Sequence, residues 1–162
     1  MNSRVKLKSI NLPKSSGVYF WYVSSEGASK LGVDIKNCFQ KENKYLVCIG
    51  LAKSIKQRLE WHCFEQHRES NIKSGFLSTL RQTLSALIVG NMIHSEEPIN
   101  KFMDNHMGIE YEVREDYIEY EKNLISKYNP PLNLKGNTNH PFYKTLKLKR
   151  KESKTNSLKH IK

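Results

Sequence analysis

The segment from Lys44 to His62 constrains the fold most, because it passes directly from an apolar run into an amphipathic one. Tyr45 to Ile49 are apolar and β-favouring, and Gly50 ends the run, which predicts a strand. Ser54 and Gln57 match the capping-box pattern, in which each side chain satisfies a free backbone N–H at a helix start. The segment therefore predicts a strand followed closely by a helix.

Two polar side chains of this predicted helix are unusual for their position. At about 100° per residue, Ile55 and Leu59 face the core, and Arg58 and His62 fall on or beside the same stripe. An arginine and a histidine one turn apart on an inward face are costly unless they meet an anion or a partner group. Arg58 and His62 are therefore candidate site residues.

A second candidate helix carries a carboxylate on its apolar face. Asp116 and Glu119 match the capping-box pattern and predict a helix start, and Glu121 then falls in the middle of the apolar stripe. A buried carboxylate is expensive unless it binds a cation or an arginine. Glu121 is therefore either a metal ligand or the partner of Arg58 in a structural ion pair.

Two further strands are expected on either side of these elements. Val18 to Val23 is apolar and aromatic throughout, which predicts a central strand covered on both faces. Tyr19 on that strand is either a core tyrosine or a site residue. Residues 109–113 alternate apolar with charged side chains, which predicts a half-exposed strand. The polar segment 24–43 is expected to connect the first two strands, with a short extra element over Val33–Phe39.

The charge distribution favours a polyanionic partner. The 162-residue chain has a formal net charge of +11, with +4 on residues 1–16, −5 on residues 95–129 and +8 on residues 130–162. Basic flanks around an acidic segment suit a nucleic acid with a carboxylate site between them. The alternative interpretation is a lysine-rich solvated surface.

Length and cysteine content indicate the number of domains and the cellular compartment. The chain is long enough for one domain, and we expect a basic arm over residues 1–16, the domain over 17–143 and a basic, flexible tail over 144–162. No apolar run is long enough to span a membrane, so no membrane association is expected. Three cysteines without a Cys-x-x-Cys pair favour reduced thiols and a cytoplasmic location.

Five short motifs in order resemble the GIY-YIG nuclease family. They are Gly17-Val18-Tyr19, Cys48-Ile49-Gly50, an arginine ten residues after Cys48 (Arg58), a helix with Glu121 followed by Leu124-Ile125, and Asn133 after a Pro-Pro break. The resemblance covers about residues 17–133. Residues 134–142 and 78–81 are similar to a bacterial branch of the family that carries a C-terminal extension.

The resemblance implies an α/β (α+β) fold in which helices flank a small, mainly antiparallel three-stranded sheet. It also implies a metal-dependent endonuclease that hydrolyses phosphodiester bonds, with DNA a better expectation than RNA. Glu121 would hold one Mg²⁺ or Mn²⁺ per active site, and Arg58 would bind the scissile phosphate. Tyr19 would orient or, as phenolate, deprotonate the attacking water, with His62 as base or proton relay.

The remaining site expectations concern substrate contacts and the motif backbone. Lys53, Arg81 and Asn133 are candidate substrate-binding residues. Gly17 and Gly50 flank the tyrosine positions of the two strand motifs, and the second tyrosine is replaced by Cys48.

Cys48 keeps a second function open, namely an inactive nucleic-acid-binding module. A third is an RNA-binding protein that uses the basic tail. For the nuclease, cutting both strands would need a homodimer or two sequential nicks, and restriction, repair and mobile-element defence are all compatible settings.

Overall fold

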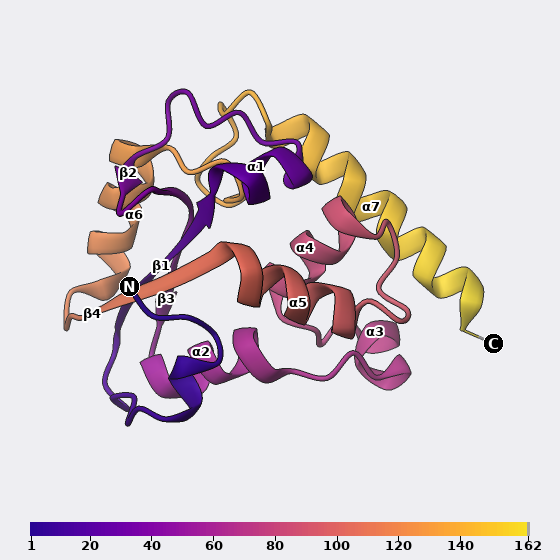
Figure 1. Ribbon diagram of the computed structural model, residues 1–162, viewed down its shortest axis with the longest axis horizontal. Helices are drawn as coiled ribbons and strands as arrows, with labels where there is room; N and C mark the ends of the chain where they lie inside the picture. Colours follow the sequence, from indigo (N-terminus) through magenta and orange to yellow (C-terminus); the bar gives the residue numbers. More distant parts are fainter. Residues whose placement is uncertain (162) are drawn as a thin grey trace.

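A mixed sheet-and-helix domain is seen in the computed structural model, which describes residues 1–161 (Figure 1). The strands are β1 (Gly17–Ser24), β2 (Gln40–Lys41), β3 (Lys44–Ala52) and β4 (Met107–Val113). Their order in the sheet is β2-β3-β1-β4, and every neighbouring pair is antiparallel. The predicted fold class is confirmed, and the two-residue β2 is a fourth strand added at the edge beside β3.

The central strand β1 is covered on both faces, as its apolar sequence predicts. Val18 and Tyr22 belong to one buried cluster, whereas Tyr19, Trp21 and Val23 belong to another. The pairing with β3 shifts between Trp21 and Tyr22, which leaves Val47 as the extra residue of a β-bulge. The two clusters correspond to the two faces of the sheet.

Helices cover these faces unequally. The helical elements are η1 (Lys6–Lys8), α1 (Ser25–Leu31), α2 (Ile55–Phe64), α3 (Glu69–Ser74), α4 (Thr79–Ile88), α5 (Glu96–His106), α6 (Tyr117–Tyr128) and α7 (Tyr143–His160). The face of Tyr19 packs against buried residues of α1, α2, α4 and α5. The opposite face packs against α6, which lies alone at the left of the sheet in Figure 1.

Two local predictions differ from the structure. The segment 24–43 contains α1, which Ser24 caps by accepting a hydrogen bond from the backbone N–H of Gly27, and no helix or strand covers Val33–Phe39. The helix α2 does begin at a Ser54 cap, as predicted. The helix α6 begins without a side-chain cap, because the Asp116 carboxylate instead accepts hydrogen bonds from Arg114.

The two ends of the chain pack onto the domain. In the N-terminal arm Leu7 and Leu12 are buried in the main core. At the other end α7 lies along α4 at the right of Figure 1, and Ser157 Oγ accepts a hydrogen bond from the Met92 backbone N–H at 2.8 Å. Residues 144–160 of the predicted flexible tail are therefore helical and packed, because Leu146, Ser153 and Ser157 share one helix face and are buried.

The division of the chain into arm, domain and tail stays a prediction.

Among residues 1–161, no helix combines the length and the apolar character that crossing a bilayer requires.

Candidate active site

A groove of about 920 Å³ runs between α2 and the start of α6. Its lining comes from the end of β3, the outward face of α2, the start of α6 and two loops: Leu51, Lys53, Ser54, Gln57, Arg58, Glu60, Trp61, Phe64, Glu65, Phe76, Tyr117, Ile118 and Lys135. The sequence-predicted residues Lys53 and Arg58 therefore share this groove.

The groove offers positive charge that the protein itself does not neutralise. Lys53, Arg58 and Lys135 form no ion pair within residues 1–161. By contrast, the Glu60 carboxylate pairs with Lys56, and the Glu65 carboxylate accepts a hydrogen bond from Asn71. The three cations of the groove are therefore unpaired, whereas its two carboxylates already have partners, which favours binding of an anion.

Arg58 lies at the edge of the α2 core stripe, half-buried. Its guanidinium carbon is 5.1 Å from the ring centroid of Trp61, a cation–π contact that holds the side chain over the groove. Within the described chain no hydrogen bond uses its guanidinium N–H groups, since those formed by arginines come from other residues. The fork of donors is thus free to bind a phosphate in bidentate geometry.

A hydrogen-bonded chain runs from β1 through α2 to the start of α4. Tyr19 Oη lies 2.9 Å from His62 Nε2, and His62 Nδ1 lies 2.7 Å from Ser78 Oγ. Both aromatic side chains are buried, with 7% of Tyr19 and 1% of His62 exposed. Ser78 also caps α4 by accepting from the Arg81 backbone N–H, so the start of α4 fixes the orientation of the His62 ring.

Burial keeps both the Tyr19 hydroxyl and the His62 imidazole uncharged. The pKa of Tyr19 is raised well above its ordinary value, chiefly by burial, with smaller contributions from Cys48 and Glu121 that the nearby Arg58 opposes. Burial, with the positive charges of Arg58 and Arg81, lowers the pKa of His62 to about 3. A resting tyrosine phenolate is therefore disfavoured, and Tyr19 acts as a hydroxyl paired with a neutral imidazole.

Both motif glycines lie where another part of the sheet approaches closely. A Cβ on Gly50 would lie 2.1 Å from Tyr19 Oη, because the two residues are paired across β1 and β3. A Cβ on Gly17 would lie 2.1 Å from the backbone oxygen of Glu112 on β4. Only glycine leaves room for the Tyr19 ring and for the β4 backbone at these positions.

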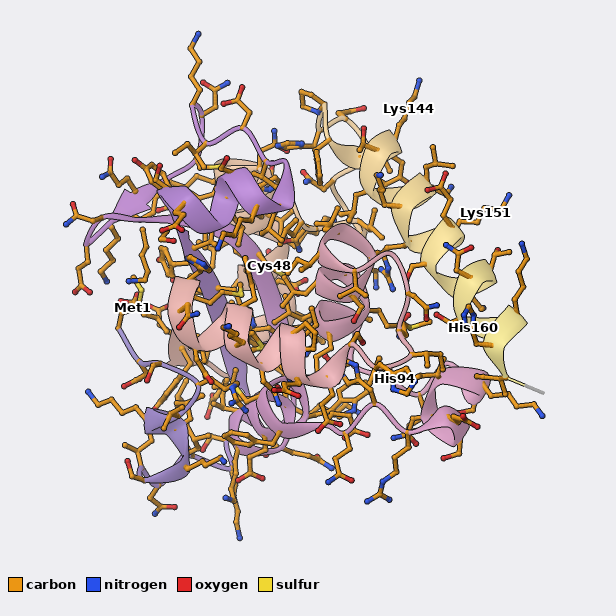
Figure 2. All side chains as sticks on the ribbon, turned by 45° about the vertical axis from the view of Figure 1, so that its right-hand side comes forward. Met1, Cys48, His94, Lys144, Lys151 and His160 are labelled. Carbon is orange, nitrogen blue, oxygen red and sulfur yellow. The ribbon has the colours of Figure 1, made fainter. Side chains whose placement is uncertain are left out.

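Cys48 occupies the position of the second motif tyrosine, opposite Trp21 in the sheet. Its label in Figure 2 lies within the body of the protein, in the region of β3. Burial raises the pKa of its thiol to about 12, with a further contribution from Glu121. Cys48 is therefore a neutral thiol and not a ready nucleophile.

Glu121 lies one turn beyond the groove residues Tyr117 and Ile118 on α6, half-buried. Burial raises the pKa of its carboxyl group, whereas the charge of Lys135 and the Leu51 backbone N–H act in the opposite direction. No ion pair joins Glu121 to Arg58 in residues 1–161, so the expected alternative of a structural pair is not formed.

The donor set around Glu121 suits a loosely held hard cation. No group of three or more His, Cys, Asp or Glu side chains converges anywhere in residues 1–161. A closed zinc-type site is therefore not supported by the described chain. Mg²⁺ is commonly bound through one or two carboxylates and completes its shell with water and substrate phosphate oxygens, which a single carboxylate beside a groove can accommodate.

Arg81 is not the substrate contact that the sequence predicts. Its side chain is fully buried, and it donates to His67 Nε2 at 2.8 Å, to the backbone oxygens of His62 and Cys63 at 3.1 Å each, and to Asn100 Oδ1 at 2.6 Å. Burial lowers its pKa to about 10. Arg81 instead caps the C-terminal end of α2 from α4, where carbonyl groups lack helical partners.

Asn133 is also used by the fold. Its Oδ1 accepts from the Ile49 backbone N–H at 2.9 Å, and its Nδ2 donates to the Ile49 oxygen at 2.7 Å. The side chain thus pairs with β3 between Cys48 and Gly50 and fixes the end of α6 beside that strand. Asn133 therefore positions the segment after α6, and its expected substrate contact stays a prediction.

Sequence reasoning missed Ser78, Trp61 and Lys135. Ser78 could have been found as the cap of a helix that follows a loop, but its bond to His62 spans sixteen residues and leaves no local pattern. Trp61 lies between Arg58 and His62 on the helix, and its place one turn after Arg58 was the signal that could have found it. Lys135 follows the Pro-Pro break, where no periodicity predicts a direction.

A family model described as a GIY-YIG catalytic domain matches residues 17–152. The chain belongs to this family. The match includes every predicted site residue and extends into α7. GIY-YIG membership supports a nuclease-type function in general and a nucleic acid as substrate, and nucleases of this family generally depend on a divalent metal. No curated protein and no solved structure matched in the corresponding comparisons.

Proposed function

We propose that this GIY-YIG protein is a metal-dependent DNA endonuclease whose active site lies at the α6 end of the α2 groove. The observation that carries the proposal is the separation of Arg58 from Glu121. Two opposite charges near one groove remain without a mutual ion pair, although both are half-buried. Such charges are costly unless a ligand satisfies them, and a phosphate with a divalent cation satisfies both.

Arg58 is proposed to bind the scissile phosphate, with Lys53 and Lys135 neutralising the neighbouring phosphates. Holding the phosphate against a fixed guanidinium stabilises the negative charge that grows in the transition state. Glu121 would hold Mg²⁺ or Mn²⁺, which supplies Lewis-acid stabilisation of the phosphate and the leaving oxygen when bound.

Tyr19 and His62 are proposed to act as one proton relay. The Tyr19 oxygen accepts a proton from the attacking water as its own proton passes to His62 Nε2, 2.9 Å away. The relay avoids a free phenolate, which burial disfavours. The imidazolium that forms donates through Nδ1 to Ser78 Oγ, and because its pKa is low it passes the proton back through Tyr19 to water once the phosphodiester bond is cleaved.

A second basic surface supports a nucleic-acid substrate. Lys144, Lys147, Lys151 and Lys154 are exposed and recur at three- and four-residue spacing, so they follow one stripe of α7. In Figure 2 the labelled side chains Lys144 and Lys151 point away from the body of the protein. A row of cations along a helix suits a phosphate backbone and predicts salt-sensitive binding.

An inactive nucleic-acid-binding module is the second candidate, and Cys48 is the observation that favours it. A neutral thiol is a weak hydrogen-bond donor and cannot replace a tyrosine hydroxyl in orienting water. An RNA-binding function differs from both in its ligand, and competition between DNA and RNA of one sequence distinguishes it. Three free cysteines accord with a cytoplasmic enzyme, with restriction, repair or mobile-element defence as settings.

Cleavage of supercoiled plasmid with Mg²⁺ tests the proposal. Wild type is expected to nick or linearise the plasmid, and Glu121→Gln is expected to lose cleavage while keeping its fold by circular dichroism. Glu119→Gln is the matched control, because Glu119 is exposed on the same helix. Cleavage by Glu121→Gln at the wild-type rate would refute the metal role. DNA binding without cleavage by wild type, on plasmid and on mixed genomic DNA, would favour the inactive module.

A further inference from the structure

The two most exposed large apolar side chains of the described chain both line the α2 groove. Phe76 is 72% exposed and Ile118 is 64% exposed, more than the other large hydrophobic residues of the described chain. Both line the groove, together with the half-buried rings of Trp61, Phe64 and Tyr117. Exposed apolar groups that gather in one concave surface indicate a ligand, whereas scattered ones need no explanation.

These rings follow the cationic end of the groove in order. On α2, Trp61 and Phe64 lie one and two turns beyond Arg58, at about 1.5 Å rise per residue. Phe76 continues the series, because it lies two residues before Ser78, which bonds His62 near the C-terminal end of α2. The groove therefore has a phosphate-binding end beside Glu121 and an aromatic end beyond it.

Trp61 is already engaged on the protein side, since His62 stacks on it at 5.8 Å with an interplanar angle of 22° and Arg58 lies over its ring. Phe64 has Arg4 and Lys8 near its ring. Phe76 makes no aromatic pair or cation–π contact within residues 1–161. Tyr117 also lacks such a contact but packs against the buried cluster under α6, so Phe76, at 72% exposed, is the most open ring of the groove.

We propose that the groove binds an unpaired nucleic-acid strand, with a base stacked on Phe76 and the phosphates held by Lys53, Arg58 and Lys135. The proposal rests on the nuclease function above and specifies its substrate class: DNA with unpaired nucleotides at or beside the scissile phosphate. Aromatic rings beside a basic track are what single-stranded binding surfaces use, because each base presents a π-face to a ring.

An intact, undistorted duplex gains little from this arrangement. Its bases are stacked on one another, and its outer surface is phosphate and sugar, from which an exposed phenylalanine gains little. A flipped, frayed or single-stranded nucleotide exposes the base faces that the rings require. An apolar segment of a partner protein is the competing occupant, but it leaves the unpaired cations of the groove without a role.

Fluorescence anisotropy with labelled oligonucleotides tests the inference. The background is Glu121→Gln without added metal, so that no strand is cut, and the probes are a short single strand and the duplex of the same sequence. We expect tighter binding of the single strand, and Phe76→Ala should weaken it by about 5- to 100-fold, as expected for loss of one stacked base. Duplex binding should change by less than about twofold.

The matched control is Phe39→Ala, which removes another exposed ring that packs near Tyr128, away from the groove. Phe76→Trp should restore single-strand binding. The inference is overturned if Phe76→Ala leaves single-strand binding unchanged, which favours a protein partner, or if it weakens both probes equally. Its failure is separable from that of the nuclease function, because wild-type cleavage that is lost in Glu121→Gln would stand in either case.

Discussion

Replacing Arg81 tests whether it stabilises the end of α2, as the structure indicates, or binds substrate, as the sequence predicts. Arg81→Met introduces an apolar side chain of similar length and removes every guanidinium donor. The buried backbone oxygen of His62 then loses its partner at the end of α2, whereas the Cys63 oxygen keeps a hydrogen bond from Arg4 Nη1 at 3.2 Å. Asn100 and His67 are half-buried, so water can replace the donor there.

The expected loss follows from the one acceptor that is left without a donor, the His62 oxygen. An unsatisfied buried acceptor costs about 1–3 kcal/mol. Relief of the buried charge offsets part of this cost, which leaves about 1.5 kcal/mol. That is a measurable fraction of the typical 5–15 kcal/mol of a folded domain, and the urea midpoint should fall by roughly 0.5–1.5 M.

Urea denaturation followed by circular dichroism measures this loss. Arg68→Met is the control, since Arg68 is exposed and, within residues 1–161, its guanidinium bonds only the Gln66 side chain. It should change stability by less than about 0.5 kcal/mol. The reasoning is refuted if Arg81→Met keeps full stability and instead binds DNA with a salt slope reduced by about one phosphate contact.

Three further predictions concern the buried side of the site. Gly50→Ala should displace Tyr19, whose Oη would lie 2.1 Å from the new methyl group, and lower the cleavage rate by about tenfold or more without unfolding the protein; an unchanged rate contradicts the relay. Because the pKa values of His62 and His67 are lowered to about 3 and about 4 from an ordinary 6.5, only the unfolded chain takes up these protons below pH 6.5. The free energy of unfolding should therefore fall with pH from 6.5 toward 4, by roughly 1.4 kcal/mol per unit for each histidine; a melting temperature that is flat between pH 7 and 5 argues against it. Cys48→Ala should keep cleavage within about threefold, and a loss of about a hundredfold would give the thiol a direct role.

Local patterns predicted the elements better than the contacts between them. The Ser54 cap, the apolar β1 and the stripe that turns His62 inward are short-range features, and the structure has all three. The interpretation of α7 failed because its buried face consists mostly of serines, which periodicity of apolar residues does not detect. Small side chains let α7 approach α4 closely. This packing depends on the surface of α4 as well as on the sequence of α7, so the α7 sequence alone does not reveal it.

The sequence could predict only those site residues whose placement is set within a single helix or strand. Arg58 and Glu121 follow from polar groups near apolar stripes. Arg81 was misjudged because its acceptors are carbonyl oxygens of another helix and side chains of distant segments, none of which is visible in a local pattern. The same reason hid the pairing of Asn133 with the Ile49 backbone, which spans 84 residues.

The strand order also has a consequence for synthesis on the ribosome. The central strand β1 is made first, but its neighbour β4 follows roughly eighty residues later. At about 5–20 residues per second, one edge of β1 waits several seconds for its partner even when β3 pairs promptly. During that interval an apolar strand presents open N–H and C=O groups, so nascent chains of this protein should depend on chaperones or on fast translation of residues 53–106 to avoid edge-to-edge association.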